Sequence, residues 1–211
     1  MARRPLPAFL RIGLPLFGAA YYFYLRPQML KAGTRSGEAL RELPGDELIP
    51  APNFQVTRAV DINAPPEMVW PWVAQIGRDG SGFYGLDSLT NQGVPSVAYL
   101  RQDLPVPQAG TALDAGYRLL SVEPSHFLIY GAFDFPTLLG ETMERTTLIL
   151  LEPAASHGTR LLVRTRGYTY SALGPIYNLF YEVFDYFQSM AQLDNIRQRA
   201  ETMARLQRPL G

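Results

Sequence analysis

The stretch VDINAPPEMVWPWVAQIGRDGSGFYGLDSLTNQG, residues 60–93, decides how this chain folds. Its first residues belong to the run FQVTRAVDIN, residues 54–63, in which apolar residues of one parity alternate with polar ones and predict a β-strand. Asn63, two prolines and a glutamate then supply the residue types of a helix start. We therefore predict a helix over about 65–76 that ends at Gly77, followed by a loop and a second short helix.

The remainder of the chain predicts further strands and then one long helix. The second short helix is expected near 84–92, and the strand-like runs are 117–123, 126–132, 144–152 and 158–167. In the last two runs, apolar residues and threonines share one face while Arg160, Arg164 and Arg166 point the other way. This alternation predicts an antiparallel sheet with one covered face and one face in water.

The terminal helix is expected over about 175–206 and carries an aromatic stripe. At 100° per residue the stripe consists of Ile176, Phe180, Val183, Phe187 and Met190. Glu182 and Asp185 fall on the opposite side, which we assign to solvent. The stripe is predicted to cover the apolar face of the sheet, and space between a curved sheet and one helix is a usual place for a small ligand.

Composition excludes several classes of protein. The chain has 211 residues, 47% of them hydrophobic, and its formal net charge is zero from 19 basic and 19 acidic residues. Neutral charge argues against a nucleic-acid binder and against disorder. With no cysteine and only two histidines, thiolate chemistry and histidine-based metal sites or triads have little to be built from. We expect no metal and no cofactor.

Residues 60–93 closely resemble the START-like, SRPBCC-type superfamily, in the group often called polyketide cyclase/dehydrase-like. The matching residues are Ile62, Ala64, Pro65, Pro66, Glu67, Val69, Trp70, Pro71, Trp72, Gln75, Gly77, Phe83, Tyr84 and Asp87. The resemblance implies an α+β helix-grip fold, in which about seven curved antiparallel strands surround the C-terminal helix and leave a hydrophobic cavity. It implies no shared catalytic residue, because activities in the group are diverse.

The chain is expected to have three parts. Residues 1–25 form an apolar segment, which we interpret as a membrane anchor or interfacial helix, a cleavable signal peptide, or a helix packed on the domain. Residues 26–53 are predicted to be a connector, and residues 54–206 the helix-grip domain. We expect a membrane-associated or cytoplasmic protein, and the charges that flank the apolar segment set no orientation.

Two groups of residues are candidates for the site. Tyr84 and Asp87, three apart on a predicted turn, would serve as proton donor and base in an enzyme, although a structural role for Asp87 is the simpler interpretation. The predicted ligand-binding residues are these two together with Thr147, Ile149, Val163, Thr165, Phe180, Phe184 and Phe187.

Three functions follow from these candidates. The first is the binding or carrying of a small hydrophobic molecule that is lipid-, sterol- or polyketide-like. The second is a polyketide cyclase or dehydratase that uses Asp87 and Tyr84. The third is a membrane-anchored interaction module without a ligand. The absence of a catalytic constellation in the sequence favours binding over catalysis.

Overall fold

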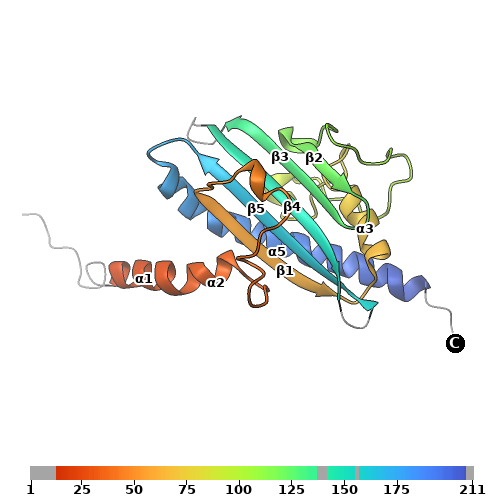
Figure 1. Cartoon of the computed structure of the whole chain (residues 1–211), viewed down its shortest axis with the longest axis horizontal. Coiled ribbons are helices and arrows are strands. Elements are labelled where there is room, and N and C mark those ends of the chain that lie inside the picture. The colour runs from red at the N-terminus through yellow and green to blue at the C-terminus, as the bar shows by residue number, and fades with distance from the viewer. Residues whose placement is uncertain (1–12, 137–141, 155–156, 208–211) are drawn as a thin grey trace, which may run out of the picture.

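A five-stranded antiparallel sheet wraps one side of a long C-terminal helix (Figure 1). The computed structural model describes residues 13–136, 142–154 and 157–207. The sheet has the order β1-β5-β4-β3-β2. Its strands are β1 (Phe54–Ile62), β2 (Arg118–Glu123), β3 (Phe127–Pro136), β4 (Thr142–Pro153) and β5 (Thr159–Thr169). The covering helix is α5 (Gly174–Gln207), and together they form the α+β helix-grip arrangement that was expected.

Two short helices follow β1, as predicted. They are α3 (Pro66–Ala74) and α4 (Asp87–Thr90), and Pro71 lies inside the first. Single 3-10 turns occur at η3 (Asp46–Leu48) and η4 (Asp114–Gly116). The resemblance overstated the number of strands, because the described residues contain five strands in this sheet instead of about seven. Residues 93–117, rich in proline and glycine, contribute one isolated bridge, between Ala112 and Arg118.

The inner face of the sheet and the second half of α5 form the main hydrophobic core. Leu193, Ile196, Ala200 and Ala204 of α5 pack there with α3 and with inward-facing strand residues. These strand residues include Ile62, Leu128, Ile149, Leu151 and Leu161. Small and aliphatic side chains of α5 thus pack against the sheet at its α3 end.

The first half of α5 faces the sheet with polar side chains, which corrects the predicted orientation of the helix. Its buried residues are Asn178, Glu182, Asp185, Ser189 and Gln192, with Glu182 and Asp185 each only 2% exposed. The predicted aromatic stripe points outward instead, since Phe180 is 74% and Phe187 is 56% exposed. The buried polar residues form a second stripe, which we call the polar stripe. It is displaced from the aromatic stripe by two residues along the helix, about half a turn at 100° per residue.

The outer face of the sheet is not in water, contrary to prediction. Residues 33–50 cross it, and Leu43 packs on Ile129, Leu148, Leu150 and Leu162 in a second core. Arg160 binds Glu38 at 2.6 Å, and Arg164 binds Asp46 at 2.6 Å and the carbonyls of Glu38, Ala39 and Arg41. The outward arginines therefore fasten this segment, which we call the strap, to the sheet.

The strap reaches the edge of the sheet through a glycine. Ala59 of β1 donates its backbone N–H to the carbonyl of Ala32 at 3.1 Å. Gly33 follows with φ +72°, and a Cβ there would lie 2.1 Å from the carbonyl oxygen of Ala59. Only glycine therefore fits this approach, which also covers the free edge of β1.

The described part of the apolar N-terminal segment is a helix in three sections. They are α1 (Leu14–Ala20), the π-helical turn η2 (Tyr21–Leu25) and α2 (Arg26–Leu30). Arg26 holds this helix to α5 through two hydrogen bonds to buried Glu182, at 2.5 and 2.6 Å. Residues 1–12 of the predicted anchor lie outside the described residues. Among those described, no helix combines the length and apolar character needed to cross a membrane.

Candidate functional site: a cavity between the sheet and helix α5

A cavity of about 210 Å³ lies between the inner face of the sheet and the first half of α5. Aromatic rings form much of its wall, and hydroxyl, amide and charged groups form most of the remainder, with Ala115 and Val163. The rings belong to Phe83, Tyr117, Tyr130, Phe135, Tyr181 and Phe184, and the polar groups to Thr90, Arg145, Thr147, Thr165, Asp185, Gln188, Ser189 and Gln192. The cavity therefore offers stacking surfaces together with hydrogen-bonding groups.

The register of the strands explains why space remains here. Thr147 of β4 lies between Tyr130 of β3 and Thr165 of β5, and the two threonine hydroxyls are 3.2 Å apart. In the next inward row, Arg145 lies opposite Gly167, which has no side chain. Small residues on β5 thus leave room that the larger aliphatic residues of the main core fill elsewhere.

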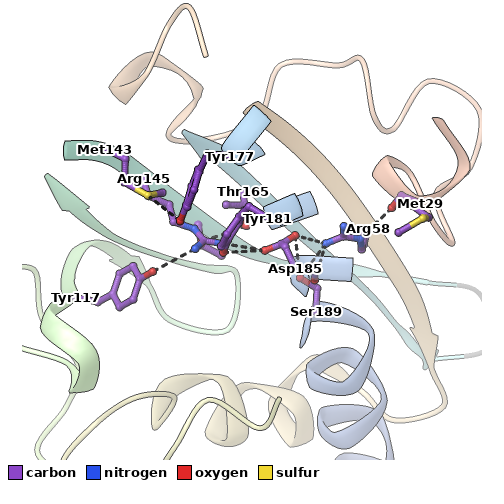
Figure 2. Close-up of polar contacts among 11 residues, drawn as sticks. Met29, Arg58, Tyr117, Met143, Arg145, Thr165, Tyr177, Tyr181, Asp185 and Ser189 are labelled. Carbon is purple, nitrogen blue, oxygen red and sulfur yellow. Dashed lines mark hydrogen bonds and ion pairs between the residues drawn. The ribbon is translucent and has the colours of Figure 1, made fainter. Parts of the chain in front are cut away.

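A buried ionic cluster forms the floor of the cavity, and Figure 2 shows its contacts. Asp185 of α5 binds Arg145 through Oδ1 at 2.8 Å and Arg58 of β1 through Oδ2. Arg58 also donates to the hydroxyl of Ser189 at 2.9 Å and to the carbonyl of Met29, beyond the cavity, at 3.1 Å. Asp185 therefore connects a charge on the cavity wall to the end of the N-terminal helix.

Arg145 is surrounded by tyrosines. Its guanidinium lies 4.4 Å from the centroid of the Tyr181 ring, and Nη1 is 3.4 Å from the hydroxyl of Tyr117. Burial alone would lower the pKa of Arg145, but the neighbouring Tyr117 and Asp185 groups outweigh it and the net shift is upward. Burial also raises the pKa of Tyr130 to about 12. At neutral pH the wall therefore presents the cation of Arg145 and the neutral phenol of Tyr130.

The loop that follows α3 closes the cavity from the side. Gln188 accepts a hydrogen bond from the backbone N–H of Leu86 at 2.6 Å, and Gln192 donates to the carbonyl of Phe83 at 2.8 Å. A Cβ at Gly85 would lie within 1.9 Å of the Gln188 amide, so glycine is required for this contact. Polar side chains of the first half of α5 thus hold this loop as well as the ionic cluster.

A larger hollow of about 580 Å³ lies at the other end of α5. It runs along Trp72, Tyr99, Arg199 and Met203 and opens widely to solvent. We take the smaller cavity as the candidate site, because it is more enclosed and holds a buried charge beside convergent polar groups.

Comparison with known proteins finds similar proteins among solved structures alone. No family model matches the chain, and neither does any curated protein. Similar solved structures include a protein from Chromobacterium violaceum, with 19% identity and a TM-score of 0.44, covering 70% of this chain and 96% of that one. A protein from Mycobacterium smegmatis has 16% identity and a TM-score of 0.42, with 73% and 92% covered.

A third similar structure is the di-domain ARO/CYC StfQ from the steffimycin biosynthetic pathway. It has 15% identity and a TM-score of 0.47, covering 71% of this chain and 51% of that one. At these identities and TM-scores, the similarity carries no inference about a ligand or a reaction.

The structure separates seven of the nine predicted ligand-binding residues into three groups. Thr147, Val163, Thr165 and Phe184 lie on the cavity wall. Ile149 is fully buried in the main core and does not line the cavity. The placement of Phe180 and Phe187 at the cavity was wrong, because the polar stripe of α5, not the aromatic one, faces the sheet.

Tyr84 and Asp87 also lie away from the cavity wall. The carboxylate of Asp87 accepts hydrogen bonds from the backbone N–H and the hydroxyl of Ser96, both at 2.7 Å. Tyr84 is buried with φ +59°, and its hydroxyl accepts a hydrogen bond from Gln75 at 2.5 Å. Both residues hold the loop after α3 in place, so the geometry gives the proposed catalytic pair no support.

The sequence interpretation missed the charged residues of the site. Arg58 has the same parity as the apolar residues of β1, and Arg145 the same parity as Thr147 and Ile149 on β4. An arginine on an otherwise apolar face is a signal that could have been used, since buried arginines are paired. Asp185 was assigned to the solvent side of α5 because it lies opposite the aromatic stripe.

Proposed function

We propose that this chain binds a small aromatic molecule in the cavity between the sheet and α5. The observation that supports this is the partly enclosed cavity of about 210 Å³ with rings on several walls. Pockets for drug-sized ligands usually measure about 300–1,000 Å³, whereas a cavity of about 150 Å³ accepts benzene. The volume therefore favours a compound of one or two rings over a sterol or a long acyl chain.

The proposed contacts are those that the cavity wall offers. Phe184 of α5 and Tyr130 of β3 would flank a ring, and Thr147 and Thr165 would supply hydroxyl groups to oxygen atoms of the ligand. We place this function before catalysis, because both carboxylate oxygens of Asp185 are engaged by arginines and leave no free base on that residue.

The test compares two phenylalanines of the same helix. Binding of 2-naphthol to the full chain is measured by isothermal titration calorimetry, alongside Phe184→Ala and Phe180→Ala. We expect Phe184→Ala to weaken binding about threefold to tenfold, as ring contacts contribute about 0.5–1.5 kcal/mol. Phe180 is exposed and should have no effect. Absence of binding by the wild type, or equal effects of both variants, would contradict the proposal.

We also propose that the helix from α1 to α2 lies against a lipid surface. Leu16, Phe17, Phe23 and Tyr24 are exposed, and Arg26 and Lys31 follow them. Exposed apolar and aromatic side chains beside basic ones are typical of helices that lie in the interface of a bilayer. This position needs no helix that crosses the membrane.

Vesicles of phosphatidylcholine with phosphatidylglycerol test the lipid contact. We expect the full chain to sediment with them and the variant Phe17→Ser with Phe23→Ser to remain in solution. Phe180→Ser, an equally exposed aromatic residue on α5, serves as the control and should sediment like the wild type. Sedimentation of the double variant to the same extent would refute the role of this helix.

A further inference from the structure

The buried ionic cluster at the cavity has one more positive charge than negative charges. Two arginines, Arg58 and Arg145, share the single carboxylate of Asp185. Glu182, the other buried carboxylate in the described part of α5, is already engaged by Arg26 at 2.5 Å. Among the residues that the structure describes, no other carboxylate forms an ion pair with Arg58 or Arg145. The two guanidiniums and the one carboxylate therefore give the cluster a net charge of +1 at neutral pH.

The guanidinium that faces the cavity is that of Arg145. Asp185 uses one oxygen for each arginine, so it cannot satisfy either guanidinium fully. Arg145 lines the cavity, whereas Arg58 is buried behind it, beneath the ring of Tyr186. Arg145 is consequently the member of the pair that a molecule in the cavity can reach.

Arg145 also has unused hydrogen-bonding capacity. A guanidinium has five N–H donors. In the described part of the chain, Nη2 donates to Asp185 and Nη1 makes a long contact of 3.4 Å to Tyr117. The ring of Tyr181 covers one face of the guanidinium, so a further acceptor would approach at its edge. A group that accepts in the plane of this edge would complete the coordination.

We propose that the ligand of this cavity is an aromatic anion, whose carboxylate or phenolate oxygen is bound by Arg145 beside Tyr117. The inference rests on the proposed binding function and adds the charge of the ligand to it. A buried cation without a full counter-charge is costly, and an anion that enters the cavity offsets this cost. The aromatic wall would hold the ring while Arg145 fixes its orientation.

Isosteric pairs of ligands test the charge. The affinities of 2-naphthoate and 2-naphthamide for the full chain are compared by isothermal titration calorimetry at neutral pH, and benzoate and benzamide serve as a smaller pair. We expect the anion of each pair to bind about tenfold or more tightly, because hydrogen bonds to charged groups are the stronger kind.

Variants of Arg145 test whether this residue causes the preference for the anion. Arg145→Gln should abolish the preference for the anion while the affinity for the amide stays within about threefold, since the aromatic wall is unchanged. This variant keeps a balanced pair of Arg58 and Asp185, so we expect it to fold. Arg118→Gln removes an exposed arginine from β2 and should leave the preference intact. If Arg145→Gln does not fold, Arg145→Lys replaces it and should reduce the preference by losing the planar fork.

Each outcome separates the two proposals. Equal affinities of the wild type for anion and amide would overturn the anionic ligand and leave cavity binding intact. A preference that persists in Arg145→Gln would overturn the assignment to Arg145. Failure of naphthoate, naphthamide and 2-naphthol alike to bind would overturn the proposed function itself.

Discussion

At the scale of single residues, Asp185 is the group on which the site depends. Its carboxylate is buried between two guanidiniums, one on β1 and one on β4, and it joins strands on either side of β5 to the helix. A buried ion pair of this kind is weak evidence for stability as a whole, but breaking it is costly because a charge is left without its partner.

We predict that Asp185→Asn lowers the free energy of unfolding by about 3–5 kcal/mol, since both arginines lose their counter-charge. Chemical denaturation followed by circular dichroism measures this loss. Asp194→Asn is the control, because Asp194 forms an exposed pair with Arg197 one turn away on the same helix. Exposed pairs contribute about 0–1 kcal/mol, so equal losses in the two variants would contradict the cluster.

At the scale of elements, the orientation of α5 sets the character of the cavity. Its second half turns aliphatic side chains inward, and its first half turns polar ones inward. Ile196 and Ile176 illustrate the difference, as the first is fully buried in the main core and the second is 57% exposed.

The two isoleucines provide a matched measurement of this orientation. We predict that Ile196→Ala costs about 2–5 kcal/mol of unfolding free energy, through lost burial and the space left behind. Ile176→Ala should change it by no more than about 0.5 kcal/mol, as is usual for surface substitutions. Urea titrations of both variants check the prediction, and the reverse ranking would place the aromatic stripe against the sheet.

The sequence predicted the elements well and the face of this helix badly, for a physical reason. Strands such as residues 144–152 alternate with a period of two, and β4 was found within two residues of that range. On α5, however, a search for apolar residues finds Phe180 and Phe187, whereas burial selects Asp185 and Ser189. The partners that make these polar groups buriable, Arg58 and Arg145, lie on distant strands and cannot be paired with them from spacing alone.

At the scale of the whole molecule, both faces of the sheet are covered. α5 covers the inner face, and the strap, residues 33–50, covers the outer one (Figure 1). The strap is held by ion pairs as well as by Leu43, and one of these pairs responds to pH. The stability of the molecule in acid should therefore report the attachment of the strap.

Glu38 is the strap residue through which this dependence acts. It accepts hydrogen bonds from Arg160 at 2.6 and 3.0 Å, and these bonds hold the pKa of Glu38 below its ordinary value of 4.5. In the unfolded chain Glu38 takes up a proton at higher pH than in the folded one. Its contribution to stability is thus complete above pH 4.5 and is lost as the pH falls through the lower, folded pKa.

We predict that Glu38→Gln is less stable than the wild type at pH 6 and that the difference narrows as the pH falls below 4.5. Urea denaturation at intervals between about pH 6 and pH 3 measures the difference directly, because the other carboxylates titrate in both proteins. Glu42→Gln, at an exposed position of the strap, should show no such narrowing. A difference independent of pH would mean that Glu38 acts through its shape and not its charge.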